Sequence, residues 1–408
     1  MGSRQYRLPR ALWVIGPGLM VMLADTDAGS VITASQSGAR WGYRLLVLQV
    51  LLVPILYLVM ELTVRLGIAT GKGHAQLIRE RFGTRWAAIS VGTLLVSALG
   101  ALVTEFAGIA GAGELFGVPR VLTVPLAAGM LVALVVSGGY RRVEVVGIAL
   151  GLFELAFAGA AVIAHPGLHA LAAGVTEAQP LGNGSYLALV AANVGAVVMP
   201  WMLFYQQSAV VEKGLGERDL RWARIDTAVG AVLTQVIMGA VLVATAASLH
   251  GSGASLRSVG EMAGALAPLL GGTTSRVVLA VGMAGAALVA SIVVSLGAAW
   301  AVAEAAGRPR SLDDGVRSAP LFYGLFTAAV VLGATLVLAS GSLVRLAVEA
   351  EILNALLLPL VLGMLVVLAR RVLPGRYALG RGHRFAVGLT TVAVTLVGIL
   401  WAGFALGL

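Results

Sequence analysis

The chain has 408 residues, of which 59% are hydrophobic and 12% are charged, and its mean hydropathy is +0.95. An average soluble domain is about 25% charged, so this much apolar surface needs the hydrocarbon of a bilayer as its solvent, and a soluble globular fold is excluded. The absence of cysteine excludes disulfides and thiolate metal sites. The net charge of +9 would suit nucleic acid, but its distribution along the chain indicates membrane topology instead.

Eleven apolar stretches are each long enough to cross about 30 Å of hydrocarbon as a helix. In chain order they cover residues 12–38, 43–70, 86–113, 120–138, 143–164, 185–211, 222–249, 274–303, 321–338, 344–369 and 385–407. We therefore predict an all-α membrane protein with a single transmembrane domain over residues 1–408. Residues 1–164 would form a first repeat with helices 1–5, residues 185–370 a second with helices 6–10, and residues 385–407 helix 11.

Basic residues concentrate in alternate loops between these helices. The N-terminal segment carries Arg4, Arg7 and Arg10, and five arginines lie between residues 370 and 384 before the last helix, whereas the loops of the opposite side hold few. This bias places the N-terminus in the cytoplasm, and an odd number of helices then places the C-terminus outside. We expect an integral protein of a bacterial-type plasma membrane, with the lipid bilayer and no nucleic acid as its partner.

The first predicted helix is interrupted by the stretch ADTDAGSVITASQSG, residues 24–38, which contains Asp25, Asp27 and Gly29. Irregular backbone at membrane depth is tolerated only where it is buried in protein or lines a wet cavity. The break frees carbonyl oxygens and the aspartates add negative charge, so the stretch predicts a cation site. Asp27 could also cap the half-helix that follows, and Asp25 could line either the site or its vestibule.

A second interruption occurs in the sixth predicted helix, in NVGAVVMPWM, where Pro200 removes a backbone donor. Breaks at corresponding positions of two five-helix halves point to the binding site of a transporter. Met199 precedes the proline. Methionine in a membrane helix usually serves packing, but a thioether beside Asp27 would favour Mn²⁺ or Fe²⁺, whereas carboxylates and carbonyls suit Mg²⁺ and Ca²⁺ equally.

Other acidic residues inside the predicted helices need a purpose, because ionisable groups are costly at membrane depth. Glu61 has Arg65 four residues later, which indicates a structural ion pair. Glu105 has no local basic partner, which favours a cation or proton route. For Glu154 a hydrogen-bonded structural role is as good an interpretation as any other. Glu351 lies deeper in helix 10 than the neighbouring acid and is a candidate for the site.

The segments GPGLMVMLADTDAGSVITASQSGARWGYRLL, TEFAGIAGAGELFG and GAVVMPWMLFYQQSAVVEKG resemble the Nramp family of divalent metal transporters. The resemblance is close in helices 1, 2, 3 and 6 and loose in helix 10. It implies a leucine-transporter-type fold with two inverted five-helix repeats and broken helices 1 and 6. It also implies a transporter rather than an enzyme, with no cofactor and a divalent metal ion as its cargo.

The resemblance assigns roles to individual residues. Asp27 matches the family's metal-binding aspartate, Ala196 the residue that offers its carbonyl, and Met199 the thioether ligand. Ser30 stands where the family has an asparagine ligand, and Glu105 matches a glutamate on the family's proton route.

Several positions depart from the family pattern. Ala28 replaces a proline, Trp201 and Gln206 replace two histidines, and Leu102 replaces an aspartate of helix 3. Glu351 takes the place of a glutamine near the metal. The predicted metal set is therefore Asp27, Ser30, Ala196, Met199, Asp25 and Glu351, with Glu105 as the candidate for a proton route.

These residues predict a secondary transporter that imports a divalent cation by alternating access, with Mn²⁺ or a related transition metal favoured. Proton coupling should be weak or absent, because histidine is the side chain whose ordinary pKa lies in the physiological range and both family histidines are missing. The main alternative is an Nramp-related transporter that binds partly hydrated Mg²⁺. A non-transporting metal sensor and an amino-acid carrier of the same fold are further alternatives, although Asp27 would repel a substrate carboxylate.

Overall fold

The computed structural model describes residues 10–251, 256, 258–339, 343–373 and 375–406. Within these ranges every regular element is a helix. Arg4 and Arg7, which contribute to the predicted cytoplasmic charge, lie outside the described residues.

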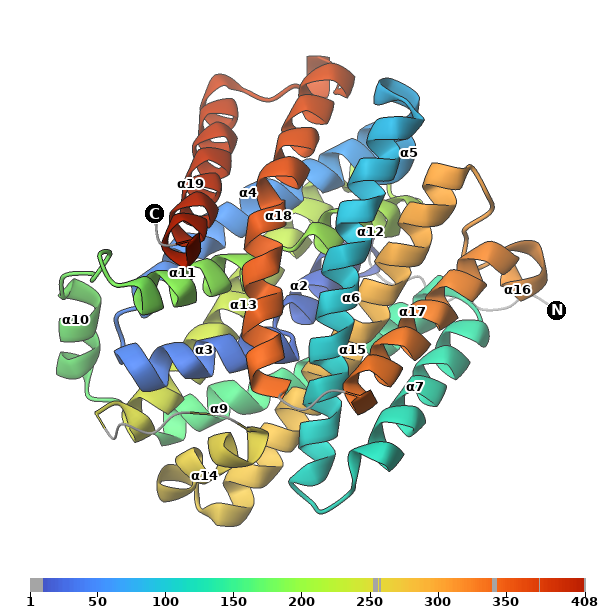
Figure 1. Cartoon of the computed structure of the whole chain (residues 1–408). Helices are drawn as coiled ribbons and strands as arrows, with labels where there is room; N and C mark the ends of the chain where they lie inside the picture. Colours follow the sequence, from blue (N-terminus) through green and yellow to red (C-terminus); the bar gives the residue numbers. More distant parts are fainter. Residues whose placement is uncertain (1–9, 252–255, 257, 340–342, 374, 407–408) are drawn as a thin grey trace.

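The helices that form the body of the molecule follow one another in this order along the chain (Figure 1). They are α2 (Pro17–Asp25), α3 (Ala28–Trp41), α4 (Leu46–Thr70), α6 (Thr84–Glu114), α7 (Arg120–Val136), α8 (Tyr140–Gly151), α9 (Leu155–Ile163), α11 (Gly184–Val197), α12 (Pro200–Glu212), α13 (Leu220–Leu249), α14 (Val259–Leu270), α15 (Gly272–Ala306), α17 (Pro320–Ala339), α18 (Leu343–Val372) and α19 (Arg381–Leu406). Shorter helices connect them, namely α1 (Arg10–Val14), α5 (His74–Phe82), α10 (Leu168–Thr176) and α16 (Gly315–Ser318), together with the 3₁₀ turns η1 (Leu152–Glu154), η2 (Glu217–Asp219) and η3 (Gly375–Tyr377).

Nine helical segments in the described part of the chain are long and apolar enough to cross a membrane. Each corresponds to one predicted span. The other two predicted spans are occupied by the pair α2 and α3, which is broken, and by α7, which is apolar but only 17 residues long. The all-helical membrane fold is confirmed, while the count of eleven spans remains a prediction. The apolar helix α14 was not predicted.

The broken helices form the centre of the molecule. In the segment formed by α11 and α12, 89% of the residues in its most apolar 18-residue stretch are buried, whereas only 22% are buried in the corresponding stretch of α19 at the periphery. Helix α3 packs against α13 and α18, and helix α12 packs against α4 and α15, so unbroken helices surround both breaks (Figure 1). This enclosure satisfies the requirement that irregular backbone at membrane depth be buried in protein.

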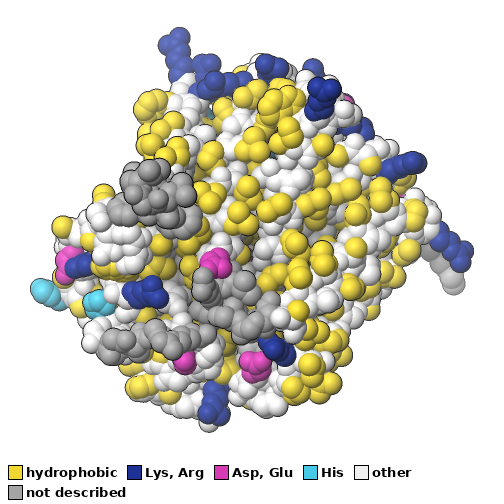
Figure 2. Space-filling model, in the orientation of Figure 1, with side chains coloured by type: hydrophobic (Ala, Val, Ile, Leu, Met, Phe, Trp, Pro, Cys, Tyr) yellow, Lys and Arg dark blue, Asp and Glu magenta, His cyan; other side chains and the backbone are white. Residues whose placement is uncertain are grey.

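The surface matches a bilayer environment. Figure 2 shows hydrophobic side chains over the middle of the visible face and lysines and arginines along its upper edge. The α4–α5 and α18–α19 connections lie at that edge in Figure 1. Large apolar side chains such as Leu122 and Leu126 are 61% and 68% exposed, as expected for side chains that face lipid.

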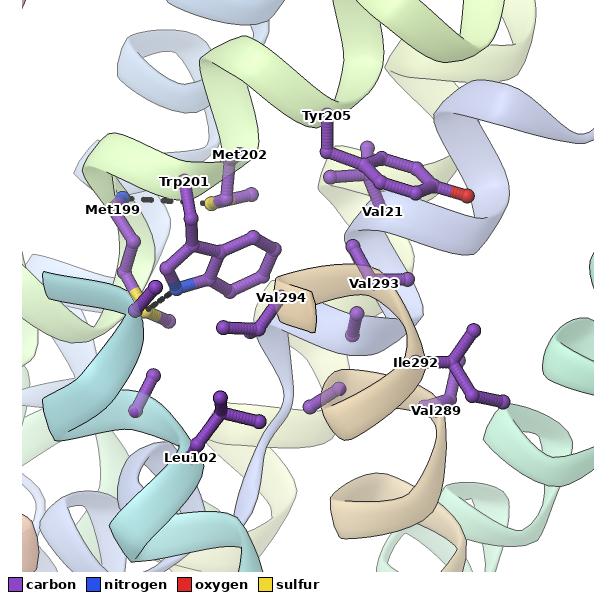
Figure 3. Packing of buried hydrophobic residues seen from close by; sticks show 14 of the residues in the cluster. Val21, Leu102, Met199, Trp201, Met202, Tyr205, Val289, Ile292, Val293 and Val294 are labelled. Atoms are coloured by element: carbon purple, nitrogen blue, oxygen red, sulfur yellow. Dashed lines mark hydrogen bonds between the residues drawn. The ribbon is translucent and has the colours of Figure 1, made fainter. Parts of the chain in front are cut away.

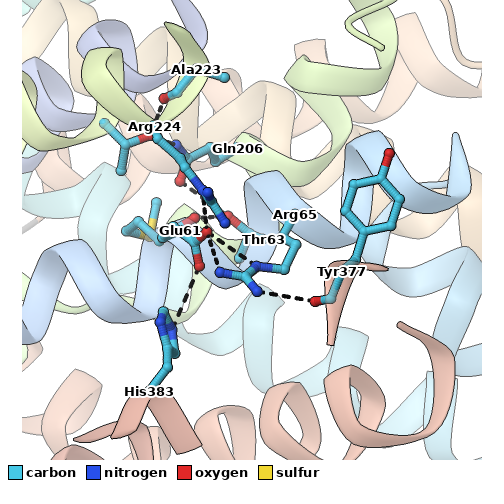
Figure 4. A network of polar contacts seen from close by, with 10 residues as sticks. Glu61, Thr63, Arg65, Gln206, Ala223, Arg224, Tyr377 and His383 are labelled. Carbon is cyan, nitrogen blue, oxygen red and sulfur yellow. Dashed lines mark hydrogen bonds and ion pairs between the residues drawn. The ribbon is translucent and has the colours of Figure 1, made fainter. Parts of the chain in front are cut away.

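A network around the buried Glu61 joins three helices at one end of the bundle (Figure 4). Its Oε1 lies 2.7 Å from a guanidinium nitrogen of Arg65, as predicted, and 2.6 Å from Nε of Arg224 on α13. Arg65 also donates to the carbonyl of Tyr377, and His383 of α19 lies 3.6 Å from the second carboxylate oxygen. Glu61 therefore connects α4, α13 and α19 and is absent from the candidate site.

Glycines bring the central helices into close contact. A Cβ on Gly195 of α11 would lie 1.9 Å from the carbonyl oxygen of Glu351 on α18, and one on Gly108 of α6 would lie 2.4 Å from Cβ of Ala28. Small residues at such crossings let backbones approach, which is the main source of helix association in membranes. The glycine at 195 thus determines how closely α18 approaches the second break.

We expect Gly195→Ala to destabilise the protein by about 1–3 kcal/mol, because the added methyl group meets backbone that cannot rotate away. The measurement is the thermal unfolding midpoint in detergent. Gly159→Ala is the matched control, since a Cβ on Gly159 meets nothing within 4 Å. An unchanged midpoint for Gly195→Ala would contradict the close crossing of α11 and α18.

Candidate cation site at the two helix breaks

The first break lies between α2, which ends at Asp25, and α3, which begins at Ala28. Asp27 caps α3, and its Oδ1 accepts a 2.6 Å hydrogen bond from the backbone N–H of Ser30. Its Oδ2 is buried and has no hydrogen-bond partner. Both sequence interpretations of Asp27 are therefore compatible, because one oxygen caps the half-helix and the other is free to bind a cation.

The second break separates α11 from α12, with Val198 and Met199 in extended conformation before Pro200. The last carbonyls of a helix lack partners within it. One of them, the carbonyl of Ala196, accepts a 3.1 Å hydrogen bond from the Ser30 hydroxyl. Three of the predicted ligands, Ser30, Asp27 and Ala196, thus lie together, and Ser30 links the two breaks.

Met199 is fully buried in the second break, but its sulfur already has a partner (Figure 3). The indole Nε1 of Trp201 donates to Sδ of Met199 over 3.1 Å. A soft metal ion would have to compete with this N–H for the thioether. Trp201, which the sequence resemblance aligns with a family histidine, therefore donates a hydrogen bond to the predicted ligand Met199.

Glu105 on α6 faces the start of α3. Its Oε2 accepts a 3.2 Å hydrogen bond from the backbone N–H of Ala28, and its Oε1 accepts one of 3.2 Å from the Thr104 hydroxyl. Negative charge is favourable at a helix N-terminus, where backbone N–H groups lack partners. Glu105 thus shares with Asp27 the capping of α3.

Glu351 approaches the first break from α18. One carboxylate oxygen, Oε2, accepts a 3.0 Å hydrogen bond from Asn354, which itself accepts one of 2.6 Å from the Ser97 hydroxyl. The other oxygen, Oε1, is buried without a partner and would lie 2.3 Å from a Cβ on Gly29. Gly29 therefore leaves room for this carboxylate beside the break.

Asp25 turns toward α13, where Oδ2 accepts a 3.4 Å hydrogen bond from the Thr234 hydroxyl and Oδ1 has no partner. Asp25, Asp27, Glu105 and Glu351 lie near enough for their charges to interact. Among the described residues, however, no three histidine, aspartate or glutamate side chains are grouped so that they alone could hold an ion. A cation bound here would need carbonyl, hydroxyl or thioether ligands as well.

The other substituted family positions lie in neutral surroundings. Gln206 accepts a 3.0 Å hydrogen bond from Thr63 and donates one of 2.9 Å to Thr227. Leu102 lies in the apolar cluster that also contains Trp201 (Figure 3). No side chain of this group exchanges protons near neutral pH.

Sequence reasoning missed two polar residues that support the site, Thr104 and Thr234. The spacing of three residues placed Asn354 on the same helix face as Glu351, and the two are hydrogen-bonded. Thr234 is 209 residues away from Asp25, and only the packing of α13 against α2 brings them together.

Comparison with known proteins finds relatives that are named as transporters. The family model described as natural resistance-associated macrophage protein-like, Nramp, matches residues 18–402. A divalent metal cation transporter MntH of Pediococcus pentosaceus is 31% identical over 59% of this chain and 57% of its own length, and MntH 1 of Pseudomonas aeruginosa is 34% identical over 63% and 62%. The chain thus spans about six tenths of those two relatives. An MntH of Burkholderia ambifaria is 26% identical over 98% of this chain and 91% of its own length.

Solved structures show the same fold at lower identity. A manganese transporter of Eremococcus coleocola superposes with a TM-score of 0.81 over 99% of this chain and 89% of that chain, at 19% identity. A nucleobase-cation-symport-1 family transporter gives a TM-score of 0.62 over 95% and 90%, at 16% identity. The second likeness supports the predicted fold class beyond the immediate relatives. Because the family model covers most of the chain, this protein belongs to the Nramp family.

Proposed function

We propose that the chain is a secondary transporter that moves a divalent metal cation across the membrane by alternating access. The observation that carries the proposal is the buried, unpartnered Oδ2 of Asp27, which lies at the first break beside the Ser30–Ala196 link to the second. A free carboxylate oxygen in a low-dielectric interior needs a cation. The relatives named divalent metal cation transporters support this choice of cargo, and none of those names describes an enzyme.

The backbone at the second break contributes to cation binding. The C-terminus of α11 carries the negative end of that helix's dipole, and its last carbonyls point out of the helix. Ala196 offers one of these oxygens, and the hydroxyl of Ser30 lies within reach of it. Asp27 would supply the principal charge, with Glu351 and Asp25 reinforcing it from α18 and from the end of α2.

Alternating access requires the enclosing helices to move. Asp27, Ser30, Ala196, Met199 and Glu351 are all 0% exposed, so the described conformation closes the site to both sides of the membrane. We assign the N-terminus to the cytoplasm from the positive-inside bias, and import as the direction of transport.

An amino-acid carrier fits these residues less well, because the free carboxylate of Asp27 would repel the substrate carboxylate. A metal sensor would bind the same ion without transporting it. Counterflow separates the two functions, since only a carrier exchanges labelled external metal for unlabelled metal inside the vesicle.

Mg²⁺ is a second candidate cargo, and one contact favours it. The Trp201 indole occupies the sulfur of Met199, so the groups left free at the breaks are oxygen atoms. Oxygen ligands suit hard cations such as Mg²⁺, whereas only softer ions gain from the thioether. We retain Mn²⁺ as the first candidate because the manganese transporter shares the fold and the thioether lies at the break.

Asp27→Asn should abolish saturable uptake and counterflow of Mn²⁺ in proteoliposomes. Asparagine still caps a helix but removes the charge, so this variant separates binding from folding better than Asp27→Ala does. Asp226→Asn is the matched control, since Asp226 is a buried cap that accepts hydrogen bonds from Gly16, Gly18 and Leu19 at the start of α2. Wild-type kinetics of Mn²⁺ uptake in Asp27→Asn would contradict the proposed site.

Met199→Ala should weaken Mn²⁺ and Cd²⁺ binding at least about tenfold more than Mg²⁺ binding, since sulfur stabilises only the softer ions. Trp201→Phe should shift the preference in the opposite direction, because it frees the sulfur from the indole N–H. The measurement is competitive uptake of the three ions. Met238→Ala controls for the loss of a buried methionine elsewhere. Equal losses for all ions in Met199→Ala would assign Met199 to packing and favour Mg²⁺.

Metal uptake should proceed with weak or no accompanying acidification, since Leu102, Trp201 and Gln206 replace the titratable groups of the family relay. Glu105→Gln should change the uptake rate less than about tenfold, because the amide oxygen can still accept from Ala28. The measurement is internal pH, reported by a trapped dye while valinomycin and potassium clamp the voltage. Acidification that depends on metal and vanishes in Glu105→Gln would show instead that a single glutamate couples the fluxes.

A further inference from the structure

A second group of unpartnered oxygen atoms lies on the α13 side of the first break, around Glu154. The Glu154 side chain is 0% exposed, and neither of its carboxylate oxygens has a hydrogen-bond partner. Such a group is costly at membrane depth unless a positive charge or a proton accompanies it. Nothing in the proposed path of the divalent ion uses it.

The local fold directs Glu154 to the break. It ends the 3₁₀ turn η1, which interrupts the helix formed by α8 and α9, and such turns inside helices often mark functional positions. Gly151, just before the turn, is so close to α2 that a Cβ on it would lie 2.7 Å from Cβ of Leu23. Asp25 and Thr26 lie two and three residues after Leu23, and both act on Glu154, Asp25 through its charge and Thr26 through its hydroxyl.

The groups around Glu154 are acceptors whose available protons are already used. The hydroxyls of Thr26 and Thr234 are hydrogen-bonded to each other over 2.7 Å, and that of Thr234 donates to Oδ2 of Asp25 over 3.4 Å. Thr26 must then be the donor to Thr234. What remains free is Oδ1 of Asp25, both oxygens of Glu154 and a lone pair on Thr26. A set of acceptors with no donor left is the chemistry of a cation site.

We propose that Glu154, Asp25, Thr26 and Thr234 form a second cation site that takes a hard monovalent cation such as Na⁺. The ligand atoms are all oxygen, which selects a hard ion. The site adjoins the divalent cation at Asp27, and a monovalent ion suffers half the Coulomb repulsion that a second divalent ion would suffer there. The inference goes beyond divalent transport and makes Asp25 a ligand of this second site, in addition to the charge that it contributes near Asp27.

The test is thermal unfolding of the purified protein in detergent with a chelator and no divalent metal. NaCl is compared with choline chloride at equal ionic strength. Bound Na⁺ should raise the unfolding midpoint by about 2 °C or more, because a ligand that binds only the folded state stabilises it. The shift should vanish in Glu154→Gln and shrink in Thr234→Val.

Thr245→Val is the matched control. Thr245 is also buried on α13, but its hydroxyl bonds only to the carbonyls of Val241 and Leu242 in its own helix, so this variant should keep the full shift. A wild-type midpoint equal in Na⁺ and choline overturns the proposal, and so does an undiminished shift in Glu154→Gln. If Glu154→Gln fails to fold, an undiminished Na⁺-dependent shift of the midpoint in Thr234→Val overturns the proposal instead.

The assay measures neither uptake nor divalent binding. Its failure would therefore remove the second site and leave the proposed transport of a divalent cation standing. Failure of the Asp27→Asn prediction would conversely leave the Na⁺ site untouched.

Discussion

Backbone groups freed at membrane depth must find partners inside the protein, and the centre of this molecule is organised around that requirement. The break in the first helix exposes N–H groups at the start of α3, and the break in the sixth exposes carbonyls at the end of α11. Asp27 and Glu105 accept from the N–H groups, and the Ser30 hydroxyl donates to the Ala196 carbonyl. The two half-helices thus satisfy one another, and the oxygens that remain free define where a cation can bind.

The same requirement explains why so many acids surround one segment. Capping α3 uses one oxygen of Asp27 and one of Glu105, whose other oxygen accepts from the Thr104 hydroxyl, and none of these hydrogen bonds brings a positively charged partner to either carboxylate. Glu351, held by Asn354, adds another beside Gly29. Within the described residues no hydrogen bond or ion pair joins Asp27, Glu105 or Glu351 to an arginine or lysine, which is the observation that supports the proposed cation site.

The choice of metal ion in the proposed site would depend on Trp201 and Gln206, the residues predicted to replace the two family histidines. Trp201 fills apolar space with Leu102 and directs its N–H at the Met199 sulfur, so one substitution removes a titratable group and also occupies the soft ligand (Figure 3). Under the proposed function, Trp201 would therefore affect both proton exchange and the preference for transition metals. Gln206 binds Thr63 and Thr227 instead, which keeps the neighbouring helices together without titrating.

The sequence by itself determined the membrane class and the order of the helices through hydropathy, and both breaks through proline, glycine and aspartate at set positions. The pairing of Glu61 with Arg65 followed from helical spacing alone. Sequence could not show that Asp27 both caps α3 and keeps an oxygen free, that Trp201 occupies the Met199 sulfur, or that Glu154 comes to the break. The bonds of Asp27 to Ser30 and of Trp201 to Met199 are local, but composition does not fix which rotamers form them. The enclosure of the remaining Asp27 oxygen and the approach of Glu154 depend on contacts between helices, and only tertiary packing decides which side chains share an enclosed space.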